Sequence, residues 1–447
     1  MADQNKLQQA IDQVLERAHA AGADADVIAN CSNNFSLKAN AGELDEYKVT
    51  SGQVIGVRVI KDQHIATCYS ESLEPASLDT MVEQALQNAL YTKQDEHQTI
   101  SCINSQLKTD VAEIYQQDNA TVDDKIELAL ALESGVVAKP HAKAAPYNGF
   151  GESDSQVILA NTQGTLCQHQ ERSTYCYAYT LYEQDDKQSM HGGMSSGRRF
   201  DELDPNYCIN HGYDIAKALL DGSPITTGSY SVIFDLSCLS SLFGAFGMCL
   251  SGQSAMKGIN PWRDALHDQV ASPLLTVSDV AFIEGGSAIK AFDSEGYATR
   301  DTILIGEGQL QSLLHNSHTA SFFGIDNTAN ASRSAKGGLG VSSRHTVIAT
   351  GTSSDAEITA GEYLELVNLQ GVHSGADAVS GDFSFGASGF LCRDGKRIQP
   401  VRGITVAGNF YQLLKEIDAV GNTLNHDYER DFFAPQIRFN KLSIAGK

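Results

Sequence analysis

The run Val54-Ile-Gly-Val-Arg-Val-Ile60, followed closely by His64-Ile-Ala-Thr-Cys-Tyr69, decides the class of fold. Both runs are short and rich in β-branched residues, which is typical of strands. A helical pattern of apolar residues stands on either side of them, over residues 7–18 and 78–90. Because strands and helices are grouped rather than regularly alternating, the sequence predicts an α+β fold with a largely antiparallel sheet.

The second half of the chain is predicted to be rich in strands and to contain a few helices. We place the boundary near residue 225, which gives an N-terminal α+β domain over 1–225 and a C-terminal β-rich domain over 226–447. A helix is expected over Leu239–Leu250, and a later one is expected to begin after an Asn409 N-cap and to run through Ile417.

Two local signals give sharper expectations about turns and caps. Thr121 with Asp124 three residues later resembles a capping box, so a helix is predicted to begin there. Asp394-Gly395 lies between two strand-like runs and predicts a type I′ hairpin turn.

Charge and composition exclude several classes of protein. The chain has 447 residues, of which 42% are hydrophobic, so it can bury a sizeable core. Its 32 Lys and Arg against 55 Asp and Glu give a formal charge of −23. A polyanion is repelled by nucleic acid and by anionic bilayers, so we expect neither as a partner.

The cysteines and the N-terminal residues indicate a compartment. Nine cysteines are scattered and show no C-x-x-C spacing, which argues against a disulfide framework or a zinc ribbon and favours reduced thiols. Residues 1–7 lack the charged and apolar regions of a signal peptide. We therefore expect a soluble cytoplasmic protein.

A nucleophile motif occurs in a polar Gly/Ser stretch from Gln184 to Arg199. Gly193-Met-Ser-Ser-Gly197 matches G-x-S-x-G, with Ser195 in the place of the nucleophile. The chemistry of that motif needs a buried strand before the serine and a helix after it, whereas polar and charged residues flank this one. The stretch is therefore predicted to be a flexible loop.

Three other motifs are weighed as binding sites. His315 and His318 are spaced to share one face of a helix, but a catalytic zinc needs a third ligand, so a packed or capping pair is favoured. The carboxylates of Asp293 and Glu295 could bind a cation, although turns often have this pattern. The glycine-rich run 336–340 lacks the strand–turn–helix context of a phosphate site.

Several segments of the second half, in this order, resemble the TldD/PmbA family. They are Phe292-Asp-Ser-Glu-Gly296, Gly381-Asp-Phe-Ser-Phe-Gly-Ala-Ser-Gly-Phe390, Pro400-Val401, Ile404-Thr-Val-Ala-Gly-Asn409, Val420-Gly-Asn422 and the final Leu442-Ser-Ile-Ala-Gly446. The resemblance covers most of residues 228–447. It departs at Thr423, where the family usually has Asp.

The resemblance implies a subunit of the TldE (PmbA) type. TldD-type subunits carry H-E-x-x-x-H on a helix and a cysteine near the end, and these hold zinc. Here Gly244 stands at the first His, Ala245 at the Glu and Cys249 at the second His, and no cysteine follows Cys392. Gly and Ala have no donor atom, and one thiol cannot hold zinc by itself. We therefore expect no catalytic residue, no metal and no cofactor in this chain, and zinc only in a TldD-type partner.

Such a subunit is expected to form a heterodimer with a TldD-like protein, or a homodimer when isolated, and to act in peptide proteolysis or maturation. An unfolded peptide could approach the backbone at Gly381, Asp382, Ser384, Gly386 and Gly389, although these glycines could equally serve bulges and turns. Two alternatives stay open: a self-sufficient hydrolase using Ser195 or an unrecognised metal site, and a gyrase modulator acting through protein contacts.

Overall fold

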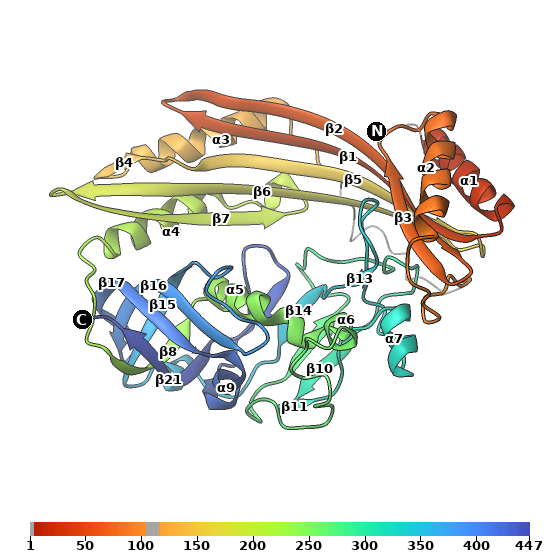
Figure 1. The fold of residues 1–447 in the computed structure, drawn as a ribbon. Helices are drawn as coiled ribbons and strands as arrows, with labels where there is room; N and C mark the ends of the chain where they lie inside the picture. Colours follow the sequence, from red (N-terminus) through yellow and green to blue (C-terminus); the bar gives the residue numbers. More distant parts are fainter. Residues whose placement is uncertain (1–3, 104–114, 116) are drawn as a thin grey trace.

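A long antiparallel sheet forms the N-terminal half of the molecule (Figure 1). The computed structural model describes residues 4–103, 115 and 117–447. The sheet has the order β3-β2-β1-β5-β6-β4, with β7 added to β6. Its strands are β1 (Asp24–Asn40), β2 (Glu43–Lys61), β3 (His64–Ser70), β4 (Ala142–Ala144), β5 (Asn148–Asn161), β6 (Leu166–Gln184) and β7 (Lys187–Gly197).

Four helices cover one face of this sheet in two pairs. The first pair packs on Val27 and its neighbours at one end of the sheet, and the second pair packs on Leu37 and Phe150 at the other end. The pairs are α1 (Gln4–Ala20) with α2 (Pro75–Ala89), and α3 (Val122–Val137) with α4 (Pro205–Ala218). The opposite face, which carries Asp26 and Ile28, packs against C-terminal residues such as Phe292.

The second half contains a closed barrel. Its sheet has the order β17-β16-β15-β8-β21-β18, and an additional pairing of β17 with β21 closes it. These strands are β8 (Gly228–Phe234), β15 (Glu362–Gln370), β16 (Asp382–Arg393), β17 (Lys396–Asn409), β18 (Ile417–Val420) and β21 (Ile437–Ala445). Helix α5 (Leu236–Phe246) packs its apolar side into this core, where the Phe246 and Phe410 rings stack with centroids 4.5 Å apart.

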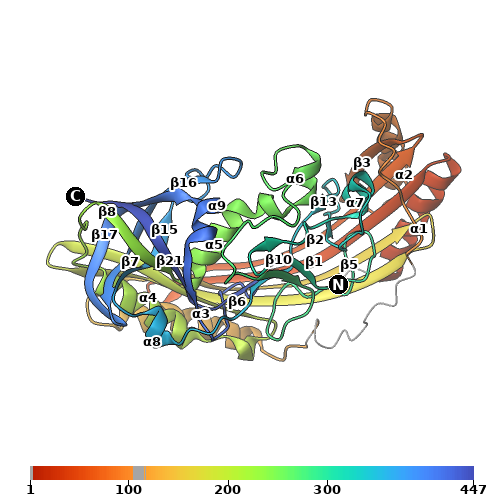
Figure 2. The same ribbon diagram turned by 90° about the horizontal axis from the view of Figure 1, so that it is seen from below.

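A second C-terminal sheet lies beside the barrel, with the order β11-β10-β9-β14-β20-β19. Its strands are β9 (Val277–Val280), β10 (Thr302–Gly306), β11 (Gln309–Leu310), β14 (His345–Ile348), β19 (Asn425–His426) and β20 (Phe432–Ala434), and β12 (Ala331–Ser332) pairs with β13 (Gly340–Val341) nearby. The short helices are α6 (Gly252–Met256), α7 (Ser317–Phe323), α8 (Asp355–Ile358) and α9 (Phe410–Leu413), with 3₁₀ turns η2 (Phe200–Glu202), η3 (Gly247–Leu250) and η4 (Leu414–Glu416). Seen from below, the long strands of the first sheet extend across both C-terminal sheets (Figure 2).

The predicted α+β class and the antiparallel character are confirmed; among the named strands described, only β8–β15 and β14–β20 pair in parallel. Thr121 caps α3 through a complete capping box with Asp124. Asp394 (φ 48°) and Gly395 (φ 75°) form the predicted turn between β16 and β17. The predicted boundary near residue 225 lies in the connection between α4 and β8, and the independence of the two halves stays a prediction.

Two sequence predictions about secondary structure are wrong. The stretch 184–199 is not a flexible loop, because residues 187–197 form strand β7, where Gly192 and Gly193 allow close contact with Tyr179 and the backbone of Cys208. The late helix ends at Leu413, since Ile417 instead begins β18 and pairs with Phe439.

Within the described residues, no helix is both long and apolar enough to cross a bilayer.

Candidate functional site

Helix α5 and the 3₁₀ turn η3 after it carry the positions at which the family resemblance expects zinc ligands. The helix begins at an Asp235 N-cap, whose side chain accepts a hydrogen bond of 2.7 Å from the backbone N–H of Cys238. Leu239, Leu242 and Phe246 bury one side of the helix in the barrel core. The other side, which includes Gly244, is exposed.

The residues at the three ligand positions do not fit a zinc ion. A Cβ at Gly244 would meet no atom within 4 Å, so this position has space but no donor. Ala245 is half-buried against the core. Cys249 is only 2% exposed, and burial raises the pKa of its thiol, which opposes the thiolate form that binds metal.

No other set of donors replaces them in the part of the chain that the structure describes, where no group of three or more His, Cys, Asp or Glu side chains could hold a metal ion. Cys392 lies in a separate cluster on β16, and burial raises the pKa of its thiol to about 11. His315 and His318, which were considered as a metal site, each have a partner within the protein. His315 precedes helix α7 and its Nδ1 lies 3.0 Å from Thr319 Oγ1, whereas His318, inside the helix, pairs with Asp95 at 2.8 Å.

A large cleft lies between the first sheet and the start of α5. Its volume is about 880 Å³. Six consecutive residues of β7, His191–Ser196, line one wall, and Asp235–Cys238 and the segment 424–428 line the opposite side. Within the described sheet β7 pairs with β6 alone, so its outer edge faces this space.

The cleft contains imidazole, phenol and carboxyl groups. The Tyr207 and His211 rings stack with centroids 5.0 Å apart. Burial is the main cause that lowers the pKa of His211, and the nearby His191 lowers it further. Burial raises the pKa of Asp235, whose carboxylate caps α5. Imidazole, phenol and hydroxyl groups are suited to hydrogen bonding with a polar chain.

Ser195 is in the wall of this cleft, but its hydroxyl is engaged. The Oγ atom accepts a hydrogen bond of 3.0 Å from the backbone N–H of Asp204, just before α4 begins. Ser195 lies within a strand rather than at a strand-to-helix turn. The geometry that activates a nucleophilic serine is therefore different from the geometry found here.

The segment singled out for peptide contact forms the start of β16. Gly381 has a positive φ of 87° and lies against Tyr411, and Asp382 accepts a hydrogen bond of 2.9 Å from Asn409 Nδ2. The side chain of Ser384 is exposed.

Strand β16 pairs along one edge with β17 and along the other with β15 over Gly386–Arg393, and Gly375 O accepts a hydrogen bond from Ser384 N. A Cβ at Gly389 would lie 1.9 Å from Glu365 O of β15, so the close approach there is made by a neighbouring strand. A peptide cannot add to β16 through main-chain hydrogen bonds.

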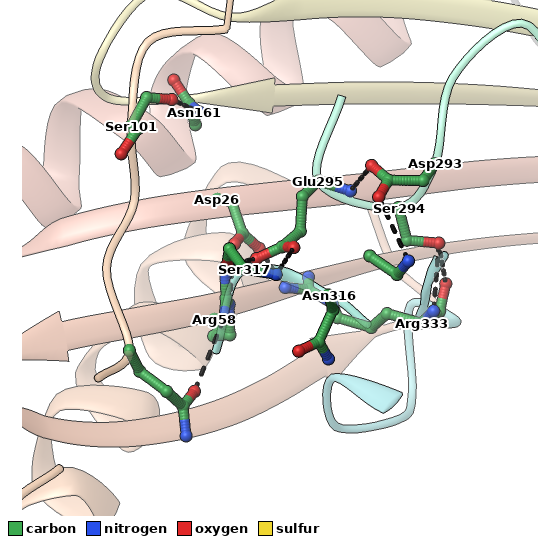
Figure 3. Close-up of polar contacts among 12 residues, drawn as sticks. Asp26, Arg58, Ser101, Asn161, Asp293, Ser294, Glu295, Asn316, Ser317 and Arg333 are labelled. Atoms are coloured by element: carbon green, nitrogen blue, oxygen red, sulfur yellow. Dashed lines mark hydrogen bonds and ion pairs between the residues drawn. The ribbon is translucent and has the colours of Figure 1, made fainter. Parts of the chain in front are cut away.

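The Asp293-Ser-Glu295 turn is part of a buried junction between the two halves (Figure 3). Asp293 accepts hydrogen bonds from the backbone N–H groups of Glu295, Tyr297 and Ala331. Burial followed by repulsion from Glu295 raises the pKa of Asp293 to about 7. These carboxylates are occupied in holding the turn rather than arranged around a cation.

Glu295 extends this junction into the first sheet. Its carboxylate accepts a hydrogen bond of 2.9 Å from the backbone N–H of Ser317 and lies 3.8 Å from Arg58 of β2. Arg58 and Arg333 both bind Asp26 of β1, and all three side chains are almost fully buried (Figure 3). The cluster therefore joins β1 and β2 to the C-terminal loops through compensated charges.

Family models match almost the whole chain. The PmbA/TldA metallopeptidase C-terminal domain matches residues 227–446, domain 1 matches residues 25–89, and the central domain matches residues 115–220. The chain belongs to the PmbA/TldD family.

Individual members of the family can be aligned with this chain over its full length. The chain is 25% identical to a metalloprotease PmbA homolog of Haemophilus influenzae, over 100% of this chain and 97% of the relative. Its fold is similar to that of TldE from Thermococcus kodakarensis, with a TM-score of 0.87 and 20% identity over 98% of this chain and 100% of the other. A candidate modulator of a DNA gyrase from Thermotoga maritima has the same TM-score, with 22% identity over 98% and 100% of the two chains.

Sequence reasoning missed the cleft, because its walls come from parts of the PmbA/TldD fold that are distant in sequence. His191 and Tyr428 lie on opposite sides of the domain boundary, yet both line it. One signal was present in the sequence. Tyr175, Tyr177 and Tyr179 alternate along a strand, which places three aromatic rings on one face.

Proposed function

We propose that this chain is a non-catalytic, TldE-like subunit that pairs with a TldD-type zinc metallopeptidase and helps to hold an unfolded peptide in the cytoplasm. The observation that carries the proposal is the chemistry of the ligand positions. Gly244 and Ala245 supply no donor atom, and Cys249 is a buried thiol with a raised pKa. A water molecule cannot be activated by residues of this kind, so the hydrolytic chemistry would come from the partner.

The cleft supports a role in peptide binding. An extended peptide can add to a free strand edge through main-chain hydrogen bonds without its sequence being read. Strand β7 offers such an edge along His191–Ser196, beside a space of about 880 Å³. The barrel strand β16 has no such edge, so the peptide-contact hypothesis moves from β16 to β7.

Co-expression with a TldD-type protein from the same genome tests the proposal. We expect the two chains to purify together through a tag on either one, and the complex to cleave an unfolded peptide faster than the TldD-type protein does by itself. Failure to co-purify, together with no gain in cleavage, would contradict the proposal. Peptide cleavage by this chain in isolation would instead support the hydrolase alternative.

A further inference from the structure

Three tyrosines form a ladder on the face of the first sheet that is turned toward the C-terminal half. We call Tyr175, Tyr177 and Tyr179 of β6 the tyrosine ladder. They alternate with Cys176 and Ala178, which face the opposite way into the core beneath α3 and α4. The tyrosine side chains therefore share the face of the strand that α3 and α4 do not cover.

Each ring of the ladder lies beside a glycine of the neighbouring strand. Tyr175 is paired with Gly151 and Tyr177 with Gly149, both of β5. A Cβ at Gly151 would be 2.5 Å from the Tyr175 ring, and one at Gly149 would be 3.2 Å from the Tyr177 hydroxyl.

The third tyrosine, Tyr179, lies beside a glycine of β7, the strand on the other side of β6. Tyr179 is paired with Gly192 of β7, and a Cβ at Gly192 would be 2.5 Å from the Tyr179 ring. The rings lie across bare backbone, which holds them close to the sheet and leaves the outer side of Tyr175 and Tyr179 accessible, each at 38% exposure.

The ladder borders two adjoining cavities. Tyr179 lines the cleft of about 880 Å³, and Tyr175 lines an adjoining cavity of about 770 Å³. The two cavities share Met194, Ser196 and Tyr428 among their lining residues and meet where Ser196 Oγ donates a hydrogen bond to Tyr428 O, and we call the two adjoining cavities together the groove. The groove follows β6 and β7 past both Tyr175 and Tyr179, as an extended chain could.

Carboxylates predominate over guanidinium groups in the groove. Its lining contains six acidic side chains and three arginines. Each arginine is already held by the protein: Arg172 lies 3.6 Å from Glu152, Arg198 donates to Gly286 O at 2.7 Å, and Arg430 lies 3.6 Å from Glu202.

The segment 427–431 concentrates negative charge near Tyr428. Burial, and then repulsion from Asp427 and Glu429, raises the pKa of Asp431 to about 6. A cation entering the groove would relieve this repulsion.

We propose that the tyrosine ladder binds arginine side chains of an extended peptide lying in this groove, so that the subunit selects arginine-bearing segments. The inference rests on the proposed peptide-binding function and adds a side-chain preference to it. A guanidinium group is planar and stacks on an aromatic face, whereas a lysine ammonium is a compact, strongly hydrated charge. The acidic side chains of the groove attract the positive charge of the guanidinium group, and its flat face stacks on the rings of Tyr175 and Tyr179.

The test compares peptides that separate charge from planarity. Calorimetric titrations of the full-length chain would use three decapeptides with the same Gly/Ser background and two arginines, two lysines or two citrullines. Citrulline keeps the planar shape of arginine without its charge. We expect the arginine peptide to bind more tightly than both others, by about 3- to 30-fold for stacking contacts of this kind.

A variant comparison then assigns the preference to the ladder. The double substitution Tyr175→Leu and Tyr179→Leu should reduce affinity for the arginine peptide by roughly 5- to 30-fold and leave the citrulline peptide less affected. Tyr91→Leu is the matched control, since Tyr91 is 90% exposed beyond the end of α2 and outside the groove. Circular dichroism checks that each variant folds.

The outcomes separate this inference from the function on which it rests. Equal affinity of the wild-type chain for the three peptides would overturn the arginine preference while leaving peptide binding in place, and this comparison needs no variant. An arginine preference that survives in the double variant would overturn the role of the ladder. Absence of any peptide binding, by the chain and by its complex with a TldD-type protein, would overturn both proposals.

Discussion

Replacing Asp26 by Asn should destabilise the junction between the two halves of the molecule. Asp26 is 4% exposed and binds Arg58 through a hydrogen bond of 2.7 Å from Nε, and it also binds Arg333. Burial alone would raise its pKa, but Arg333 and Arg58 together lower the pKa below its ordinary value. The substitution leaves two buried guanidinium groups without their main counter-charge, which typically costs about 3–5 kcal/mol.

Urea unfolding gives the assay, followed by circular dichroism and by fluorescence. The chain contains a single tryptophan, Trp262, which is buried in the barrel core and reports on the C-terminal half. If the junction couples the halves, Asp26→Asn should shift the Trp262 transition as well as the circular dichroism transition. A double variant with Arg333→Met should be less destabilised than the sum of the two single changes, by at least about 1 kcal/mol.

Glu46→Gln is the matched control, because it removes the same charge from an exposed pair. Glu46 and Lys38 lie 3.3 Å apart on the surface, where solvent screens their attraction, so losing the pair should change the free energy of unfolding little. A loss below about 1 kcal/mol for Asp26→Asn, equal to that of the control, would refute the reasoning about buried charge. An unmoved Trp262 transition would refute the coupling between halves.

Three further predictions concern the barrel, the junction and the ligand positions. Gly389→Ala should destabilise the barrel by more than about 2 kcal/mol in urea unfolding. At Gly386 the added Cβ would lie 3.4 Å from its nearest neighbour, so Gly386→Ala should cost less than about 1 kcal/mol. Equal losses of stability in the two variants would contradict the packing argument. Asp293 has a pKa of about 7 in the folded chain against about 4 when unfolded, so the folded state binds more protons between these values. Its contribution to stability should therefore increase as pH falls from 7 to 5, by about 2 kcal/mol, and a thermal unfolding series in which Asp293→Asn keeps the same slope would contradict this assignment. The double substitution Gly244→His and Ala245→Glu should bind no stoichiometric zinc by metal analysis, because a third ligand is still missing; one tightly held zinc per chain would show that the ligand set is misplaced.

Local signals in the sequence predicted those elements that depend on local physics. The Thr121 capping box and the Asp394-Gly395 turn satisfy their own backbone groups, so they could be recognised without a tertiary context. Strand β7 could not, because its glycines are required by contacts with Tyr179 and Cys208 that are distant in sequence. A Gly/Ser-rich run therefore resembled a loop.

For the candidate site too, some features could be predicted from the sequence and others depend on tertiary packing. The resemblance placed Gly244, Ala245 and Cys249, and their lack of donors follows from residue type alone. The burial of Cys249 and the open space at Gly244 depend on how α5 packs into a barrel closed by β17 and β21. The pairing of β17 with β21 joins residues far apart in the chain, so no local sequence pattern predicts it.

Zinc quantification with a peptidase assay tests the central claim most directly, performed on this chain alone and on its co-purified complex with a TldD-type protein. The account predicts far less than one zinc per chain and no peptide cleavage for the isolated protein, with both zinc and activity present in the complex. One firmly bound zinc ion in the pure isolated chain, accompanied by cleavage, would contradict it.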